Sequence, residues 1–413
     1  MIKESNDNSA GGPSGLTYRI LKDLPDEVLI EFYNQLTDIW KSKSFPIWLS
    51  KKLLYPIAKK EKERIDIDNL RPIMLLEVLR KIWAKIIIKK IRNVWEQENV
   101  LQPTQQGFRV NRGCPNGVLQ CVNAMEESDY STLPLFGTSW DISAAFDSVA
   151  RPLIELSLRR LGVPQTIAEF LAHIDDEDEV RISTPGTENG RLGMTFHTER
   201  GVGQGDSISP NLWIAFFDIM LTALKIGTVA DFFYIDREGA VHTTPDCAFA
   251  DDLLSISGCL ETIQRKADIL SALGIILDIN FSHKKFRTFT CNVHGAHAIF
   301  LHNENWEEIR VPIQGDSFIK YLGATMNLDH SSSEEEKILQ AKITEIMLRY
   351  TRKVDTPEHH TRYGQAAVMP ALTYRTQFAK VRPSKLEVLA KRLRIHTKDF
   401  FLTNKLKDYV TRR

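Results

Sequence analysis

The chain has 413 residues and a mass of 47.2 kDa, enough for roughly two to four domains, which excludes a small disulfide-stapled scaffold. Its composition is 43% hydrophobic, 26% charged and 9% aromatic, as expected of a folded soluble protein, and excludes disordered and collagen-like chains. The formal net charge is zero. The longest apolar stretch, 214–226, is interrupted by Asp218 and Lys225, so no membrane anchor is expected.

The zero net charge hides a segregation along the chain. The stretch 51–92 carries a net charge of +8 and the stretch 341–413 a net charge of +11, whereas 93–340 carries −17. Solvated helix faces are the ordinary explanation of such runs. Basic surfaces on both sides of an acidic centre also suit an enzyme that grips a phosphate backbone and gathers carboxylates around metal ions.

The first third of the chain reads as mainly helical. Two helices broken near Pro25 are expected between Leu16 and Trp40, after the turn Gly11-Gly12-Pro13-Ser14-Gly15. A short apolar segment, 53–58, follows, and then a helix from about Leu75 to Val94 that carries a basic stripe of lysines four residues apart.

The middle of the chain alternates strands and helices. Residues 136–142 read as a buried strand that ends at Asp141, and helices follow to about 173. Hairpins are predicted for 180–198 and 232–243, a helix for 207–225, a strand pair for 247–256, a helix for 261–273 that ends at Gly274, and further strands to 325. This order predicts an α+β fold whose antiparallel sheet has helices on one face, followed by a helical basic region.

Carboxylates stand at the ends of two of the apolar strands. Asp141 ends one strand, and Asp251 and Asp252 lie in the otherwise apolar segment 247–256. Charged side chains are seldom buried unless they are paired or bind metal, although a solvated turn would also explain an isolated Asp-Asp pair. Carboxylates from neighbouring strands are ligands that hard divalent cations prefer, and phosphoryl transfer often uses two such ions about 4 Å apart.

A glycine-rich segment lies between the two carboxylate sites. It reads Arg200-Gly-Val-Gly-Gln-Gly-Asp-Ser-Ile-Ser-Pro210 and leads directly into a predicted helix. Its glycines let the backbone approach a ligand closely, and Gln204 offers both a donor and an acceptor.

These segments, in this order, resemble motifs A, B, C and E of reverse transcriptases, most closely those of non-LTR (LINE-type) retrotransposons. Motif A corresponds to Asp141-x4-Phe146-Asp147, motif B to the glycine-rich segment, motif C to Phe249-Ala-Asp-Asp252, and motif E to Tyr321-Leu-Gly323. Further similarities are Gly12-Pro-Ser-Gly-Leu16 to an N-terminal motif, 69–76 and 106–114 to fingers motifs, and Val368–Tyr374 to a thumb signature.

The resemblance implies a role for each matching residue. Asp141, Asp251, Asp252 and the carbonyl group of Ile142 would hold two Mg²⁺ ions, for which Mn²⁺ could substitute, and the three aspartates would be catalytic. Phe146 would exclude a ribose 2′-hydroxyl, and the nucleotide would also contact Lys59, Lys60, Arg71, Gln204 and Gly205. Arg109 and Arg112 would contact the template strand. The alternatives are ordinary core packing for Phe146, a surface role for Arg71 and the two lysines, and a structural role for Arg109 and Arg112.

The sequence departs from the family pattern at four positions. Gly203 stands where proline is usual, Ala144 where lysine is usual, and Phe249 where tyrosine is common. In motif D the expected lysine is replaced by His283, with Lys284 next to it, so either side chain could be the general acid for pyrophosphate.

The resemblance therefore predicts a right-hand polymerase. Fingers with an N-terminal extension would occupy 1–135, the palm 136–325 with some fingers segments folded into it, and a helical thumb 326–413. The function would be RNA-directed DNA synthesis on an RNA template from a DNA primer with deoxynucleoside triphosphates. The matched segments cover a polymerase core, with no endonuclease, zinc knuckle or RNase H segment visible beside it.

Three other functions are compatible with the sequence. They are an inactive retroelement remnant that binds nucleic acid, a related polymerase that makes RNA, and a metal-dependent hydrolase or nuclease. The intact aspartates argue against the remnant, and Phe146 argues against an RNA product. Five cysteines, an odd number, together with a polar N-terminus, predict an intracellular protein, nuclear or cytoplasmic.

Overall fold

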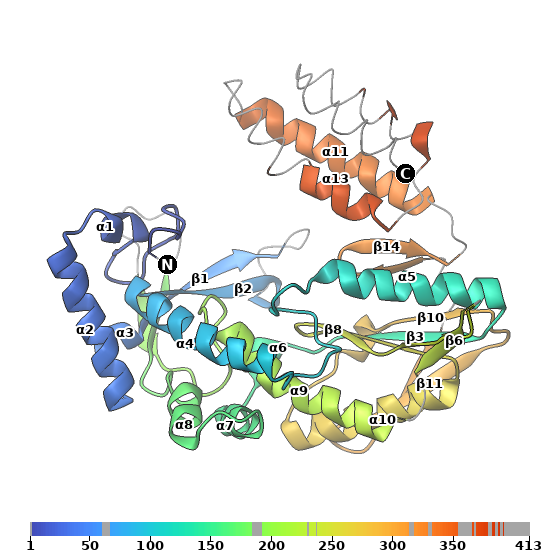
Figure 1. The fold of residues 1–413 in the computed structure, drawn as a ribbon, viewed down its shortest axis with the longest axis horizontal. Coiled ribbons are helices and arrows are strands. Elements are labelled where there is room, and N and C mark those ends of the chain that lie inside the picture. Colours follow the sequence, from blue (N-terminus) through green and yellow to red (C-terminus); the bar gives the residue numbers. More distant parts are fainter. Residues whose placement is uncertain are drawn as a thin grey trace.

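The computed structural model describes residues 2–59, 67–183, 192–228, 231–236, 238–313, 318–328 and 333–353, together with 366, 369–378, 382–384, 387–388 and 391. Lys60 and Val368, both named above, lie outside these residues. The described helices and strands form two main sheets with helices packed around them, below a pair of C-terminal helices (Figure 1). None of the described helices is long and apolar enough to cross a membrane.

The first sheet has the strand order β2-β1-β4-β5. Its strands are β1 (Lys51–Ala58), β2 (Leu70–Leu76), β4 (Glu179–Ser183) and β5 (Leu192–Phe196). Strands β1 and β2 are antiparallel, and β4, which comes more than 100 residues later, pairs in parallel with β1. The hairpin predicted around 180–198 is thus present and belongs to this first sheet, which we call the fingers sheet.

Helices from two stretches of the chain lie on the same side of the molecule as this sheet (Figure 1). They are α1 (Tyr18–Lys22), α2 (Asp26–Ser42), α3 (Ile47–Ser50), α4 (Val78–Gln97), α7 (Arg151–Arg160) and α8 (Gln165–Ala172). The break at Pro25 between α1 and α2 is as predicted. Helix α4 begins later than expected because Leu75 and Leu76 still pair with β1, opposite Leu53 and Lys52. The 3₁₀ turn η1 (Ile67–Asn69) precedes β2.

The N-terminal glycine turn is fixed to the start of α4. The backbone N–H and the hydroxyl of Ser14 both donate to the carboxylate of Glu77, at 2.8 and 2.6 Å. Gly12 lies against the backbone of Glu77, where a Cβ would come within 2.6 Å of its nitrogen. Only glycine fits at this contact.

The second sheet is the palm, with the antiparallel order β10-β3-β9-β8. Its strands are β3 (Leu135–Trp140), β8 (Cys247–Phe249), β9 (Asp252–Ser257) and β10 (Arg287–Cys291). The elements around it are α5 (Cys114–Ser131), α6 (Ala145–Ser148), α9 (Ser209–Gly227), α10 (Leu260–Leu277) and η2 (His283–Lys285), with hairpins β6 (Phe232–Ile235)–β7 (Val241–Thr244), β11 (His297–His302)–β12 (Glu308–Ile313) and β13 (Phe318–Tyr321)–β14 (Ala324–Asn327).

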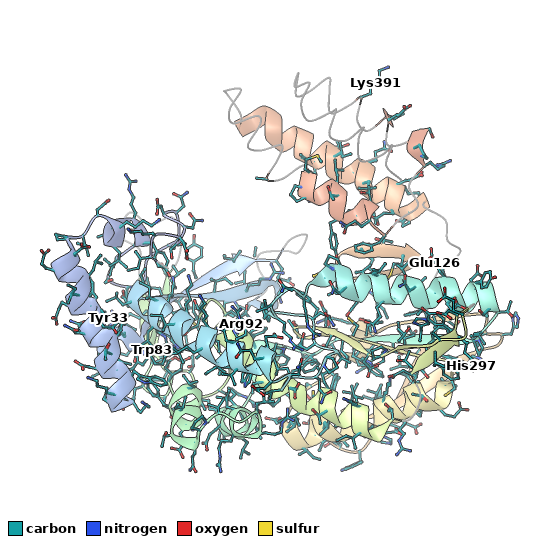
Figure 2. All side chains as sticks on the ribbon, viewed as in Figure 1. Tyr33, Trp83, Arg92, Glu126, His297 and Lys391 are labelled. Atoms are coloured by element: carbon teal, nitrogen blue, oxygen red, sulfur yellow. The ribbon has the colours of Figure 1, made fainter. Side chains whose placement is uncertain are left out.

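Both faces of the palm sheet are covered by helices. Leu253 of β9 packs in the core that contains α9 and α10, whereas Leu254, its neighbour, packs in a second core with Val118 of α5. Figure 1 shows α5 on one side of the strands and α9 and α10 on the other, and Figure 2 marks α5 by Glu126. The α+β class and the right-hand polymerase fold are confirmed, but the expectation of helices on one face is wrong. β9 is buried on both faces, and α5 supplies the second cover.

Helix α10 also differs from its predicted end. Gly274 lies inside the helix, which continues to Leu277 and ends at Asp278 in the left-handed conformation, φ 54°. The glycine is needed for packing, because a Cβ there would come within 2.9 Å of the carbonyl oxygen of Ile279.

The C-terminal helices α11 (Ser333–Lys353) and α13 (Met369–Thr376) pack on the β13–β14 hairpin. The hydroxyl of Tyr374 donates to the carbonyl oxygen of Leu322, at 2.7 Å, and Arg375 of α13 pairs with Glu335 of α11 at 3.0 Å. The predicted motif E turn at Tyr321–Gly323 is therefore fixed to a helical unit. The limits of fingers, palm and thumb remain predictions, and α5 lies in space with the palm.

Candidate active site

The two carboxylate sites predicted from the sequence meet at one end of the palm sheet. Asp141 directly follows β3, Asp251 lies in the turn between β8 and β9, and Asp252 begins β9. In the antiparallel register of β3 and β9, Trp140 is opposite Leu253. Asp141 and Asp252 are therefore the next neighbours across the two strands.

Burial and neighbouring negative charge raise the pKa values of the two motif C carboxylates, Asp251 and Asp252. The pKa of Asp252 is raised to about 6 by loss of hydration and by the negative charges of Asp251 and Asp141. The pKa of Asp251 is raised by burial and by Asp141. The group thus holds more negative charge than its protein surroundings neutralise, which is the electrostatic character of a cation site.

The oxygen atoms present suit a hard divalent cation. Ser282 N–H donates to the Asp141 carbonyl and Ser143 N–H to the Asn280 carbonyl, both at 2.8 Å, on either side of a bridge between Ile142 and Phe281. This pattern directs the carbonyl of Ile142 away from Phe281, toward the side of β9. Among the residues that the structure describes, no three His, Cys, Asp or Glu side chains converge on one point by themselves. Ligand atoms from the backbone and from bound substrate would complete the coordination of a hard cation.

One lysine reaches this group of carboxylates. The ammonium nitrogen of Lys285 lies 3.0 Å from Oδ2 of Asp141. Lys285 is on η2, the same turn that carries His283 and Lys284, the two residues predicted for motif D. Of the three basic residues on this turn, Lys285 is the one that contacts Asp141. The general-acid roles of His283 and Lys284 stay predictions.

The glycine-rich segment lies between the fingers sheet and α6. The backbone N–H of Met74, on β2, donates to the carbonyl of Gln204 at 2.7 Å, and the side-chain amide of Gln204 donates to Asp147 at 3.2 Å. Gly205 has φ +117°, and a Cβ there would come within 2.5 Å of the Met74 carbonyl oxygen. Glycine is therefore required at 205.

Phe146 lies next to this segment on α6. Its ring is half-buried and stacks on Trp213 of α9, with centroids 5.6 Å apart and planes at 22°. Its carbonyl accepts from Val202 N–H at 2.8 Å. Phe146 and the glycine-rich segment that carries Gln204 and Gly205 are thus in contact. Their roles in nucleotide binding stay predictions.

Comparison with known proteins agrees with this arrangement. The family described as reverse transcriptase (RNA-dependent DNA polymerase) matches residues 57–326. The chain belongs to the reverse transcriptase family. Members of this family use divalent metal ions and act on a nucleic-acid template, a primer and nucleotides.

Two relatives are similar over much of the chain. The RNA-directed DNA polymerase from mobile element jockey of Drosophila melanogaster is 29% identical over 249 residues, covering 57% of this chain and 24% of the relative. The Pol polyprotein from type-2 retrotransposable element R2DM of the same species is 24% identical over 297 residues, covering 70% of this chain and 25% of the relative. The chain spans about a quarter of the length of these relatives. The prediction of a non-LTR reverse transcriptase domain is confirmed.

A solved structure, apo telomerase from Candida tropicalis truncated from its C-terminal domain, is similar with a TM-score of 0.43 at 12% identity. It covers 68% of this chain, which in turn covers 60% of that structure.

The basic residues predicted to contact nucleotide lie on the fingers sheet of this reverse transcriptase domain. Arg71 is exposed on β2, opposite Ile57 of β1. Lys59 directly follows β1, and its charge partly offsets the burial that raises the pKa of Asp147, so it lies near the Gln204–Asp147 contact. Lys60, the alternative lysine, lies outside the described residues.

The two arginines predicted to contact the template differ in their surroundings. The side chain of Arg109 is 1% exposed, pairs with Glu96 at 2.8 Å and donates to the carbonyl of Gln102 at 2.9 Å. Since its donors are used inside the protein, Arg109 has a structural role, which contradicts the predicted contact with the template. Arg112 is half-buried and donates to the carbonyl of Pro103 at 2.6 Å.

Sequence reasoning missed an ionic network that supports motif B. Arg80 of α4 is fully buried and donates to Asp206 through two nitrogens, at 3.0 and 2.8 Å, and also to Asp175. Asp206 directly follows Gly205, so the network fixes the end of the glycine-rich segment to α4. The signal was present in the sequence, because Arg80 shares a helical face with Trp83, Ala84 and Ile87, all buried.

Proposed function

We propose that this chain is an RNA-directed DNA polymerase that extends a DNA 3′ end along an RNA template by two-metal phosphoryl transfer. The observation that carries the proposal is the meeting of Asp141, Asp251 and Asp252 at one end of the palm sheet, where the pKa values of Asp251 and Asp252 are raised. Asp141, Asp251, Asp252 and the carbonyl of Ile142 are the groups that would hold two Mg²⁺ ions. When bound, such ions lower the pKa of the attacking 3′-hydroxyl and neutralise charge on the triphosphate.

The remaining residues bind and orient the substrates. Lys59 and Arg71, on the fingers sheet, supply positive charge for the triphosphate. Gln204 and Gly205 line the position of the incoming nucleotide, and the hydrogen bond from Gln204 to Asp147 fixes the orientation of its amide. Arg112 is the arginine that we retain for the template.

The aromatic ring of Phe146 gives the preference for deoxynucleotides. Its stacking on Trp213 restricts where the ring can move, so it closes against a ribose 2′-hydroxyl. The substitution Phe146→Ala should raise ribonucleotide incorporation at least tenfold relative to deoxynucleotide incorporation, on the order of 1.4 kcal/mol of lost discrimination. If the variant discriminates between deoxynucleotides and ribonucleotides as the wild type does, Phe146 is an ordinary core residue.

Primer extension tests the function itself. A DNA primer annealed to an RNA template is incubated with Mg²⁺ and deoxynucleoside triphosphates, and wild-type protein is compared with Asp251→Ala. An exposed aspartate on α10 provides the matched control, Asp268→Ala. Extension by the wild type and the control, abolished in Asp251→Ala, supports the proposal. A folded wild type that binds the primer–template and extends nothing favours the inactive nucleic-acid-binding remnant.

An intracellular location, nuclear or cytoplasmic, is likewise our proposal. It is supported by the five cysteines, all of which are free thiols in this structure.

A further inference from the structure

The turn that carries Asp251 has an unusual backbone conformation. Ala250, between Phe249 and Asp251, has φ +58°, in the left-handed region where a residue with a Cβ is strained. Its two neighbours in the chain are the last residue of β8 and a metal-binding carboxylate. Such a turn persists only where surrounding contacts fix it.

A glutamine side chain supplies these contacts. Gln105 is 1% exposed, and its amide bonds both backbone polar groups of Ala250. The Ala250 N–H donates to Oε1 of Gln105 at 3.0 Å, and Nε2 of Gln105 donates to the Ala250 carbonyl at 3.2 Å. The N–H of Gly107 donates to the same Oε1 at 2.8 Å, which fixes the amide in one orientation.

The backbone around Gln105 adds to this contact. The segment 104–107 runs alongside β8, with Ala248 N–H donating to Thr104 and Gln106 N–H donating to Ala248, at 3.0 and 2.7 Å. Gly107 lies so close to the turn that a Cβ there would come within 2.4 Å of the Ala250 nitrogen. Side chain and backbone therefore bind the same turn.

We propose that Gln105 is a positioning residue for the reaction, holding Ala250 in its left-handed conformation and so setting the direction of Asp251 and Asp252 toward the divalent cation. Gln105 is buried behind the turn and acts through it. The proposal rests on the proposed function of the three aspartates. It goes beyond that function by assigning cation affinity to a residue outside the ligand set.

A second glutamine in the same chain provides a matched control. Gln264, on α10, accepts from the N–H of Phe300 and donates to its carbonyl, both at 2.8 Å, which is the same two-way contact made away from the carboxylates. Methionine is close to glutamine in size and cannot make either bond well. Gln105→Met and Gln264→Met therefore remove the same chemistry at two places.

The experiment measures Mn²⁺ binding by calorimetry, with primer–template present, and backbone hydrogen exchange across 247–253, alongside primer extension. Gln105→Met should weaken Mn²⁺ binding about tenfold or more, since loss of partners behind metal ligands typically costs this much. It should also speed exchange at Ala250 by at least about tenfold. Gln264→Met should change neither quantity. Wild-type Mn²⁺ affinity in Gln105→Met, or an equal loss in Gln264→Met, would overturn the proposal.

Two further variants keep the test decisive if Gln105→Met does not fold. Gln105→Glu keeps an acceptor for Ala250 N–H but faces its carbonyl with a second acceptor, and Gly107→Ala pushes a methyl group toward the same turn. Both should weaken Mn²⁺ binding, and wild-type affinity in both would contradict the proposal. A wild type that binds Mn²⁺ but extends no primer would defeat the proposed function and leave the positioning role measurable.

Discussion

Two groups of three aspartates, the fingers group and the palm group, differ in how much positive charge surrounds them. Between fingers and palm, Asp175, Asp178 and Asp206 surround the buried cations of Lys52 and Arg80, with oxygen to nitrogen distances of 2.5 to 3.0 Å. At the end of the palm sheet, the ion pair recorded among the described residues for Asp141, Asp251 and Asp252 is that of Asp141 with Lys285, whose side chain is 61% exposed.

The pKa values follow this difference. Burial alone would raise the pKa of Asp175, but Arg80 and Lys52 outweigh it and hold the pKa well below its ordinary value. In the palm, burial and neighbouring carboxylates act in the same direction and raise the pKa of Asp251 and Asp252. The first group is neutralised by the protein and is structural. The second lacks such neutralisation, as the proposed cation site requires.

Replacing a palm aspartate should have the largest effect, on activity. Asp141→Asn should lower the rate of primer extension at least about a thousandfold, because metal-ion catalysis supplies several kcal/mol of transition-state stabilisation. Single-turnover extension on an RNA template measures this rate. A loss of less than about tenfold would mean that the palm group is not the metal site.

Replacing a cation of the fingers group should instead cost stability. Arg80→Met leaves Asp175 and Asp206 buried without their shared partner, and should lower the free energy of unfolding by about 3–5 kcal/mol. Urea denaturation measures the change. A variant within 1 kcal/mol of the wild type would show that this network is not structural.

The pH dependence of stability shows whether the ionised carboxylate of Asp175 stabilises the folded protein. Because the folded-state pKa of Asp175 is lowered from 3.8, its contribution is complete above about pH 4 and is lost as the pH falls further. Asp175→Asn should be less stable than the wild type at neutral pH, and the difference should shrink below pH 4. Denaturation of both proteins at a series of pH values measures this. A difference that grows in acid would contradict the assignment.

The smallest effect is expected at the lysine of the palm group. Lys285→Met should change the free energy of unfolding by less than about 1 kcal/mol, since its ion pair with Asp141 is largely exposed. Removing this competing charge should also strengthen Mn²⁺ binding a few-fold, on the order of 1 kcal/mol. Calorimetric titration measures the affinity. Weaker Mn²⁺ binding would show that Lys285 assists the cation site.

The sequence alone singles out Asp141, Asp251 and Asp252 as candidate site residues, because a carboxylate at the end of an apolar strand is unusual whatever its partners are. The sequence does not predict contacts between residues that are far apart in the chain. The template role of Arg109 was implied by the family resemblance, and the sequence does not show its burial because that burial depends on Glu96, on a different element. Gln105 could not be assigned, since its role depends on a turn 145 residues away.

Local geometry decided two further points. Within the run His283-Lys284-Lys285, the 3₁₀ turn selects which side chain reaches Asp141, and spacing alone does not show this. The second cover of the palm sheet by α5 follows from β9 being buried on both faces. A short, mainly apolar run is typical both of a fully buried strand and of a buried helix, so the sequence alone does not show this cover.

On the proposed function, the palm aspartates lack sufficient positive charge because they bind divalent cations. The most direct test of this claim is the denaturation midpoint of wild type and Asp251→Asn, each with and without Mn²⁺. Without metal, the variant should be at least as stable as the wild type, because one repelling charge is removed. Mn²⁺ should stabilise the wild type much more than the variant. A variant that is less stable without metal, or that gains as much from Mn²⁺, would contradict the claim.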